Sequence, residues 1–124
     1  MSHSGPSDAA ARLQLATIYQ WYAQELHYFA DRLEQIVEPD GSTMLDNTLI
    51  LWGSELAVGN THSWQDMPFV LLGGTSAIKT GQYLQFDGDN HCQLLVALCN
   101  AMGVDIDSFG GFDDGSGALP GLLA

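Results

Sequence analysis

Basic side chains are almost absent from this sequence. Three lysines and arginines stand against 15 aspartates and glutamates, so the formal net charge is -12. Binding to nucleic acid or to an anionic membrane surface needs clustered Lys and Arg, so neither partner is expected. Charged residues of both signs make up 15% of the chain, below the roughly 25% of ordinary soluble domains. A surface poor in charge indicates that another chain covers part of it.

Long apolar runs and a secretory leader are also missing. No stretch of about 18 apolar residues is present, so no transmembrane helix is expected, and the first eight residues lack a signal-peptide pattern. Cysteine is scarce: Cys92 and Cys99 lie seven residues apart in a predicted helix, too far for a disulfide between them. Reduced thiols fit a cytoplasmic protein, and a cytoplasmic location is the expectation.

The chain has 124 residues, which is enough for one domain and excludes folds that need about 250. After a leader, 1–6, residues 7–37 contain no Gly or Pro, and Ser7 is the expected N-cap. Apolar side chains recur at steps of three and four, which predicts one long helix. These residues are Leu15, Ile18, Tyr22, Leu26, Phe29, Leu33 and Ile36.

The second half of the chain predicts strands and a shorter helix. The short apolar runs 48–52 and 68–72 are typical of strands buried on both faces, and 78–86 resembles a weak hairpin or an edge strand. A helix follows over 91–102, with Gly103 as its C-cap. The tail, 105–124, is expected to wrap over the body. The predicted class is α/β, a small mixed sheet with a long N-terminal and a C-terminal helix.

The loop 54–66, between the two predicted strands, carries the candidate chemistry. Glu55 follows the first strand and His62 comes seven residues later, and ligands of α/β sheets bind beyond the carboxyl ends of strands. Carboxylate and imidazole are zinc ligands, so these residue types indicate either a metal site or ordinary loop hydrogen bonding. Ser54, His62 and Asp66 also have the residue types of a Ser-His-Asp triad. That alternative lacks the second glycine of a nucleophile elbow.

Several short motifs, taken in order and spacing, resemble one family. The chain is similar to the C-terminal part of a large bacterial family of unknown function within the alkaline phosphatase and sulfatase superfamily, from about Leu15 to its end. The motifs are the segments 48–56 (TLILWGSEL), 59–62 (GNTH), 68–74 (PFVLLGG), 80–84 (TGQYL), 90–91 (NH) and 94–105 (LLVALCNAMGVD).

This resemblance implies a three-layer α/β sandwich that holds two divalent metals, usually zinc, at the carboxyl edge of its sheet. Glu55 would match the acidic ligand and His62 the following histidine ligand. Two features depart from the superfamily. Leu56 stands where a second histidine ligand is usual. The first metal-binding aspartate and the Ser/Thr nucleophile belong to N-terminal segments that this sequence does not contain, so the covalent phospho-enzyme mechanism cannot be carried over.

Two copies with facing loops would together supply four ligands. His91 is either a third ligand from each chain or a polar helix-start residue. Asp66 is either a ligand or a partner that orients His62. The resulting hypothesis is a Zn²⁺-dependent hydrolase in which Glu55, His62 and Asp66 serve catalysis through metal-activated water. Its expected substrates are small phosphotriesters or aryl phosphodiesters, in a pocket lined by Trp52, Trp64 and Tyr83.

The alternative is a non-catalytic dimerising or packing module that keeps vestigial ligands. The long helix carries Tyr19, Trp21 and Tyr28 away from its main apolar stripe. If one face of the helix covers the sheet, this second aromatic set forms a patch that monomers rarely expose. A homodimer built on this helix is therefore expected under either hypothesis.

Overall fold

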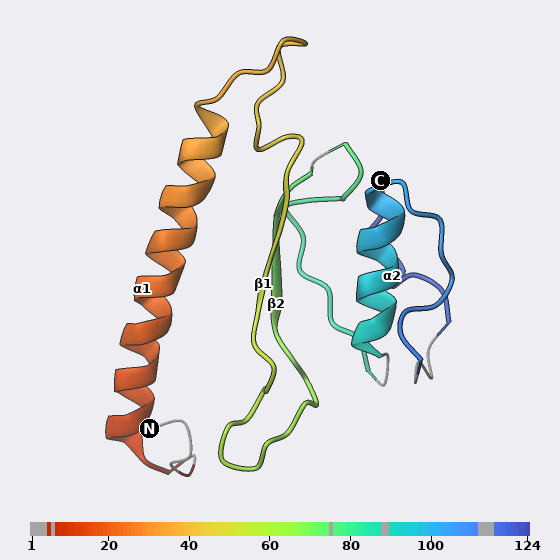
Figure 1. Cartoon of the computed structure of the whole chain (residues 1–124). Helices are drawn as coiled ribbons and strands as arrows, with labels where there is room; N and C mark the ends of the chain where they lie inside the picture. The colour runs from red at the N-terminus through yellow and green to blue at the C-terminus, as the bar shows by residue number, and fades with distance from the viewer. Residues whose placement is uncertain (1–4, 6, 75, 88–89, 112–115) are drawn as a thin grey trace. The chain divides into compact units, whose positions relative to one another are not determined.

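The computed structural model describes residues 5, 7–74, 76–87, 90–111 and 116–124. Within these residues the elements are α1 (Ala9–Glu34), β1 (Leu49–Gly53), β2 (Phe69–Gly73) and α2 (His91–Ala101) (Figure 1). The α/β class predicted from the sequence is therefore confirmed. The chain divides into two compact units, one ending at Gly73 and one beginning at Gly74. Apart from Gly5, the expected leader lies outside the described residues.

α1 is one uninterrupted helix of 26 residues. It begins one residue later than predicted, because Asp8 and not Ser7 is the N-cap: the Asp8 carboxylate accepts a hydrogen bond from the backbone N–H of Ala11 at 2.9 Å. A carboxylate there satisfies an unpaired N–H and also favours the positive end of the helix dipole. No helix in the described part of the chain has the length and apolar character to cross a bilayer.

The segment after α1 folds back on itself before the first strand. The N–H of Met44 donates to the carbonyl of Ile36 at 2.8 Å, next to an isolated bridge between Val37 and Thr43. At the tip, the Ser42 hydroxyl donates to the Asp40 carboxylate at 2.6 Å. This hydrogen bond and a second from the Ser42 N–H hold the pKa of Asp40 below its usual value. The polar groups of Asp40 and Ser42 in this turn are therefore hydrogen-bonded to each other.

β1 and β2 form an antiparallel pair in which Leu49 lies opposite Gly73 and Gly53 opposite Phe69. The sheet formed by the described residues is thus antiparallel, where the sequence predicted a mixed one. Each strand begins one residue later than predicted. The expectation of strands buried on both faces is also wrong: Leu51 is 40% exposed and Val70 42%. Two strands alone have too few neighbours to cover both faces.

Gly73 ends β2 at a crowded position. Its φ is +74°, and a Cβ built there would lie 2.1 Å from the carbonyl oxygen of Thr48 and 2.6 Å from that of Leu45. Only glycine combines this left-handed backbone with so close an approach of another main chain. The close packing of main chains at the open end of the hairpin, where Gly73 lies opposite Leu49, therefore depends on the absence of a side chain at residue 73.

In the second unit, α2 is capped at both ends. The Asn90 side chain accepts from the N–H of Cys92 at 2.9 Å, while the Gln93 side chain accepts from the N–H of Asn90 at 3.1 Å, which makes a capping box. At the other end Gly103 has φ +81°, and the N–H of Val104 donates to the carbonyl of Cys99 at 2.9 Å. This is a Schellman ending, in which Met102 is the C-cap and Gly103, the predicted C-cap, is the residue after it.

The core of the second unit forms around α2. Val96 and Ala97 have no exposed surface, and four further residues are buried: Ile78, Leu94, Leu119 and Leu122. The C-terminal segment returns past 77–79, where the N–H of Lys79 donates to the carbonyl of Leu122 at 2.8 Å. The hairpin or edge strand expected over 78–86 is reduced to one bridge, between Ile78 and Leu123. Gly81, three residues after this bridge, has a left-handed backbone with φ +70°.

Candidate functional site

The loop 54–68 joins β1 to β2, at the hairpin end that lies away from Leu49 and Gly73 (Figure 1). It contains a small ladder of its own: the N–H of Ala57 donates to the carbonyl of Ser63 at 2.8 Å, and the N–H of Ser63 donates to the carbonyl of Val58 at 3.2 Å. Residues 59–62 form the turn between Val58 and Ser63. The sequence Gly59-Asn60 supplies residues that favour such a turn. Glu55 lies before this ladder, two residues after β1 ends.

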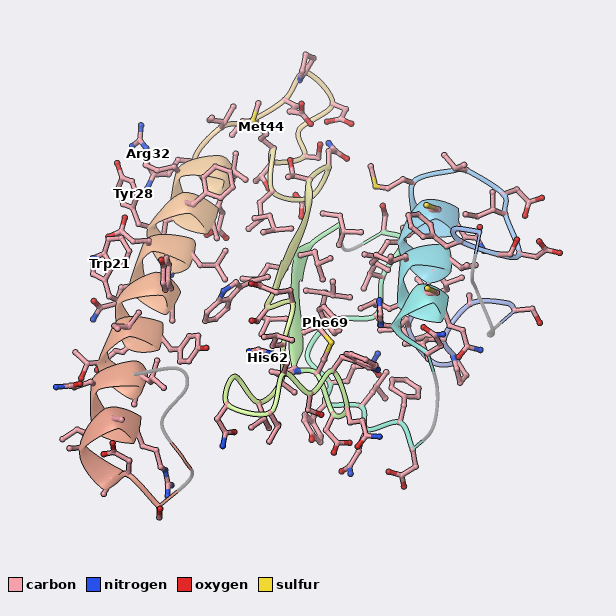
Figure 2. The ribbon with its side chains drawn as sticks, turned by 60° about the horizontal axis from the view of Figure 1, so that its bottom comes forward. Trp21, Tyr28, Arg32, Met44, His62 and Phe69 are labelled. Carbon is pink, nitrogen blue, oxygen red and sulfur yellow. The ribbon has the colours of Figure 1, made fainter. Side chains whose placement is uncertain are left out.

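His62 closes the turn in a left-handed backbone conformation, with φ +52°. Asp66, four residues later, has φ +57°. Histidine and aspartate enter this region more often than most residues, and in a short hairpin loop it turns the chain back into the ladder. Figure 2 shows His62 on the loop at the end of the strand pair. The backbone thus places the imidazole on the exposed part of the loop.

The predicted site residues are distributed over both units. Glu55, His62 and Asp66 all belong to the 54–68 loop and all are exposed. His91 is the first residue of α2 in the second unit, and is exposed as well. Among the described residues, no group of three His, Cys, Asp or Glu side chains is placed to hold a metal ion. The loop therefore presents individual donors and not an assembled cluster.

A catalytic zinc site normally takes three protein ligands and leaves one position for water. The side chains that the structure describes do not complete such a set. The described residues thus do not by themselves fit a metal centre, and no reaction step through a metal follows from them.

The three aromatic residues predicted to line a substrate pocket belong to different units, Trp52 and Trp64 to the first and Tyr83 to the second. Trp52 is half-buried within β1, Trp64 is 71% exposed on the loop, and Tyr83, in the second unit, is 86% exposed. Two shallow hollows on the described surface are lined by other residues. One, of about 390 Å³, lies at residues 105–108. The other, of about 620 Å³, lies on α1 between Ala9 and Tyr19. Both are open to solvent.

The most extensive exposed apolar surface of the first unit lies on α1. Only Ala11, Ala30 and Leu33 of this helix are buried. Its exposed large apolar side chains are Leu13, Ile18, Tyr19, Trp21, Tyr22, Tyr28 and Phe29. Figure 2 shows Trp21, Tyr28 and Arg32 along one side of α1. The exposed apolar side chains of the helix therefore extend from Leu13 to Phe29.

Comparison with known proteins identifies no relative of this chain. No family model, curated protein or solved structure matches it. The resemblance to the alkaline phosphatase and sulfatase superfamily therefore rests on the short motifs between residues 48 and 105. Neither the metal ligands nor the activity that this resemblance implies has further support from the comparisons.

Proposed function

We propose that this chain is a packing module that works by associating with itself. The observation that carries the proposal is the exposure of α1. Trp21 is 54% exposed, Tyr28 63% and Leu13 71%, although a large aromatic side chain is among the most favourable groups to bury. Isolated exposed apolar residues are ordinary, but several large ones along one side of a helix mark an interaction surface.

The composition supports the same function. Residues 13–24 of α1 contain no charged side chain, in a chain whose net charge is -12. Interface cores are depleted in charge and enriched in Trp and Tyr relative to other surfaces. A partner can therefore cover this stretch without burying an unpaired charge, whose desolvation would oppose association.

Light scattering on a sizing column, over roughly 1 to 100 µM protein, tests this function. The expected particle is larger than 13.4 kDa, the mass of one chain, and its mean mass rises with concentration. Raising the salt concentration should favour association, because it screens the repulsion between acidic chains. A mass of one chain at every concentration and salt would contradict the proposal.

A second candidate function is the metal-dependent hydrolysis of phosphate esters, with phosphotriesters or aryl phosphodiesters as substrates. The specific observation in its favour is the 54–68 loop, where Glu55 follows β1 and the turn at His62 leaves both side chains exposed. Since the described part of one chain offers no complete donor set, the proposed site is shared, with Glu55 and His62 from each of two copies. Carboxylate and imidazole donors of this kind suit Zn²⁺.

Zinc titration by calorimetry, with elemental analysis of the dialysed protein, tests this second function independently of activity. A shared site predicts about one Zn²⁺ per two chains, and His62→Ala should weaken binding at least about 10-fold. The matched control is His27→Ala, because His27 is also exposed and has a carboxylate neighbour, Asp31, at 3.4 Å. Equal effects of the two variants, or no binding by the wild type, would exclude Glu55 and His62 as a metal pair.

A further inference from the structure

On the basis of the proposed self-association, we infer the surface and the orientation: two copies pair through α1, antiparallel, with Trp21 against Trp21 of the partner subunit. The contact side of the helix is defined by Leu13, Thr17, Trp21, Gln24 and Tyr28, and is called the Trp21 face below. At about 100° per residue these side chains fall within roughly 80° of arc. All five are exposed.

The position of Trp21 favours a two-fold pairing. α1 extends from Ala9 to Glu34, so Trp21 lies at its midpoint. When two such helices cross antiparallel at Trp21, nearly their whole lengths overlap, about 37 Å at 1.5 Å per residue. The same register brings Leu13 of each copy beside Tyr28 of the other. Leu13 lies eight positions before Trp21 and Tyr28 seven positions after it, so the two fall at nearly equal distances from the crossing point. A single self-complementary surface is all that a two-fold dimer requires.

The charges of α1 favour the antiparallel orientation over the parallel one. The half of the helix before Trp21 carries Arg12, whereas the half after it carries three carboxylates and one guanidinium: Glu25, Asp31, Arg32 and Glu34. A parallel pair would place the two acidic halves side by side. An antiparallel pair places each acidic half beside the half of the partner that carries Arg12 and no carboxylate within the helix, and also opposes the two helix dipoles.

The conformation of Trp21 suits an anchor residue. Its indole packs edge-on against the ring of Tyr22, with the ring centroids 5.1 Å apart. A side chain already held by a neighbour loses less conformational freedom when a partner binds it. Trp and Tyr are also the residue types most often found at the centres of interfaces, where they carry most of the binding energy.

The available area is small and indicates a weak, concentration-dependent dimer. From the exposed fractions of Leu13, Trp21 and Tyr28, these three side chains offer on the order of 400 Å² per chain. Both copies together contribute roughly 800 Å², about half of a standard interface of roughly 1,600 Å². The neighbouring Ala10, Gln14, Thr17 and Gln24, which are also exposed and uncharged, lie where they would contribute much of the remainder.

The first test of this surface is Trp21→Glu, compared with the wild-type chain by light scattering or sedimentation. Two copies of the change face each other at the dimer centre, so the dimer Kd is expected to rise at least about 100-fold. The matched control is Trp64→Glu, since Trp64 is an exposed tryptophan, 71% against 54% for Trp21, that lies outside α1. Circular dichroism checks that both variants keep their helices. Association that survives Trp21→Glu unchanged would overturn the assigned surface while leaving self-association intact.

The second test measures orientation by disulfide formation. Ala10→Cys and Arg32→Cys, mixed with one of them carrying a tag, should give a cross-linked heterodimer, because residues 10 and 32 lie at equal distances from Trp21. Both positions are exposed and neither is an anchor. The wild-type chain, with Cys92 and Cys99, measures the background. Cross-linking of Ala10→Cys only to itself would indicate a parallel pair and overturn the inferred orientation.

Discussion

Replacing Gly73 with alanine is expected to destabilise the first unit by roughly 3 to 4 kcal/mol. About 1 to 2 kcal/mol arises from the left-handed backbone at φ +74°, which a Cβ disfavours. The remainder arises from crowding, since the added carbon would lie 2.1 Å from the Thr48 carbonyl oxygen and must push a main chain aside. Faster amide exchange over β1 and β2, together with an earlier urea transition, would report the loss.

Gly41→Ala is the matched control for this variant. Gly41 has φ +88°, but a Cβ added to it would meet no atom within 4 Å, so only the backbone cost of about 1 to 2 kcal/mol is expected. It lies in the same unit, and so the same probes apply. If Gly73→Ala and Gly41→Ala lower the free energy of unfolding by equal amounts, the close approach of Gly73 to the Thr48 and Leu45 carbonyls is incorrect.

Val96→Asp is expected to unfold the second unit. Val96 has no exposed surface, and α2 offers no counter-charge, since its residues 91–101 include no Lys or Arg. A carboxylate buried there without a partner costs several kcal/mol, which is comparable with the total stability of a small domain. Loss of amide protection over α2 at pH 7 is the expected measurement.

Two comparisons identify the cause of that loss. Val96→Ala removes two methyl groups without adding charge, so it should cost about 2 kcal/mol and leave α2 folded. The penalty of Val96→Asp should also fall as the pH is lowered towards 4, because burial raises the pKa of a carboxyl and favours its neutral form. Equal stability of the Asp and Ala variants at pH 7 would place residue 96 at the surface.

The helices could be predicted closely because their signals are local. The three-and-four spacing from Leu15 to Ile36 predicted α1, although the helix ends at Glu34 and so stops before Ile36, and Gly103 indicated where α2 ends. The prediction of Ser7 as the N-cap was wrong, because Ser and Asp can both cap a helix. Only the geometry decides that the Asp8 side chain accepts from the N–H of Ala11.

The strands were located to within one residue, but their surroundings were not predicted correctly. An apolar run such as 49–52 indicates a strand without stating how many strands lie beside it. The antiparallel pairing and the exposure of Leu51 and Val70 depend on such neighbours. The loss of the expected strand over 78–86 has the same cause, because the partner of Ile78 is Leu123, 45 residues further along the chain.

For the candidate site, the sequence predicted which loop carries the residues but not the conformation of that loop. That Glu55 and His62 share the loop after β1 follows from their place in the chain. The left-handed backbone at His62 and Asp66 has no unambiguous sequence signal, since either residue also adopts ordinary conformations. Whether Glu55 and His62 lie close to further metal ligands depends on side chains far away in the sequence or in another molecule. Local sequence patterns do not encode such contacts.

The hairpin described above also affects how the chain behaves when it is not fully folded. In the described residues each strand is paired on one side only, and neither LILWG nor FVLLG contains a charged residue or a proline. The unpaired backbone N–H and C=O groups of such edge strands form hydrogen bonds with strands of other molecules. Short uncharged β-forming segments are also typical of amyloid cores. Pro68, directly before β2, is the nearest gatekeeper residue. Concentrated or partly unfolded protein is thus expected to form fibrils from this hairpin, at a surface separate from α1.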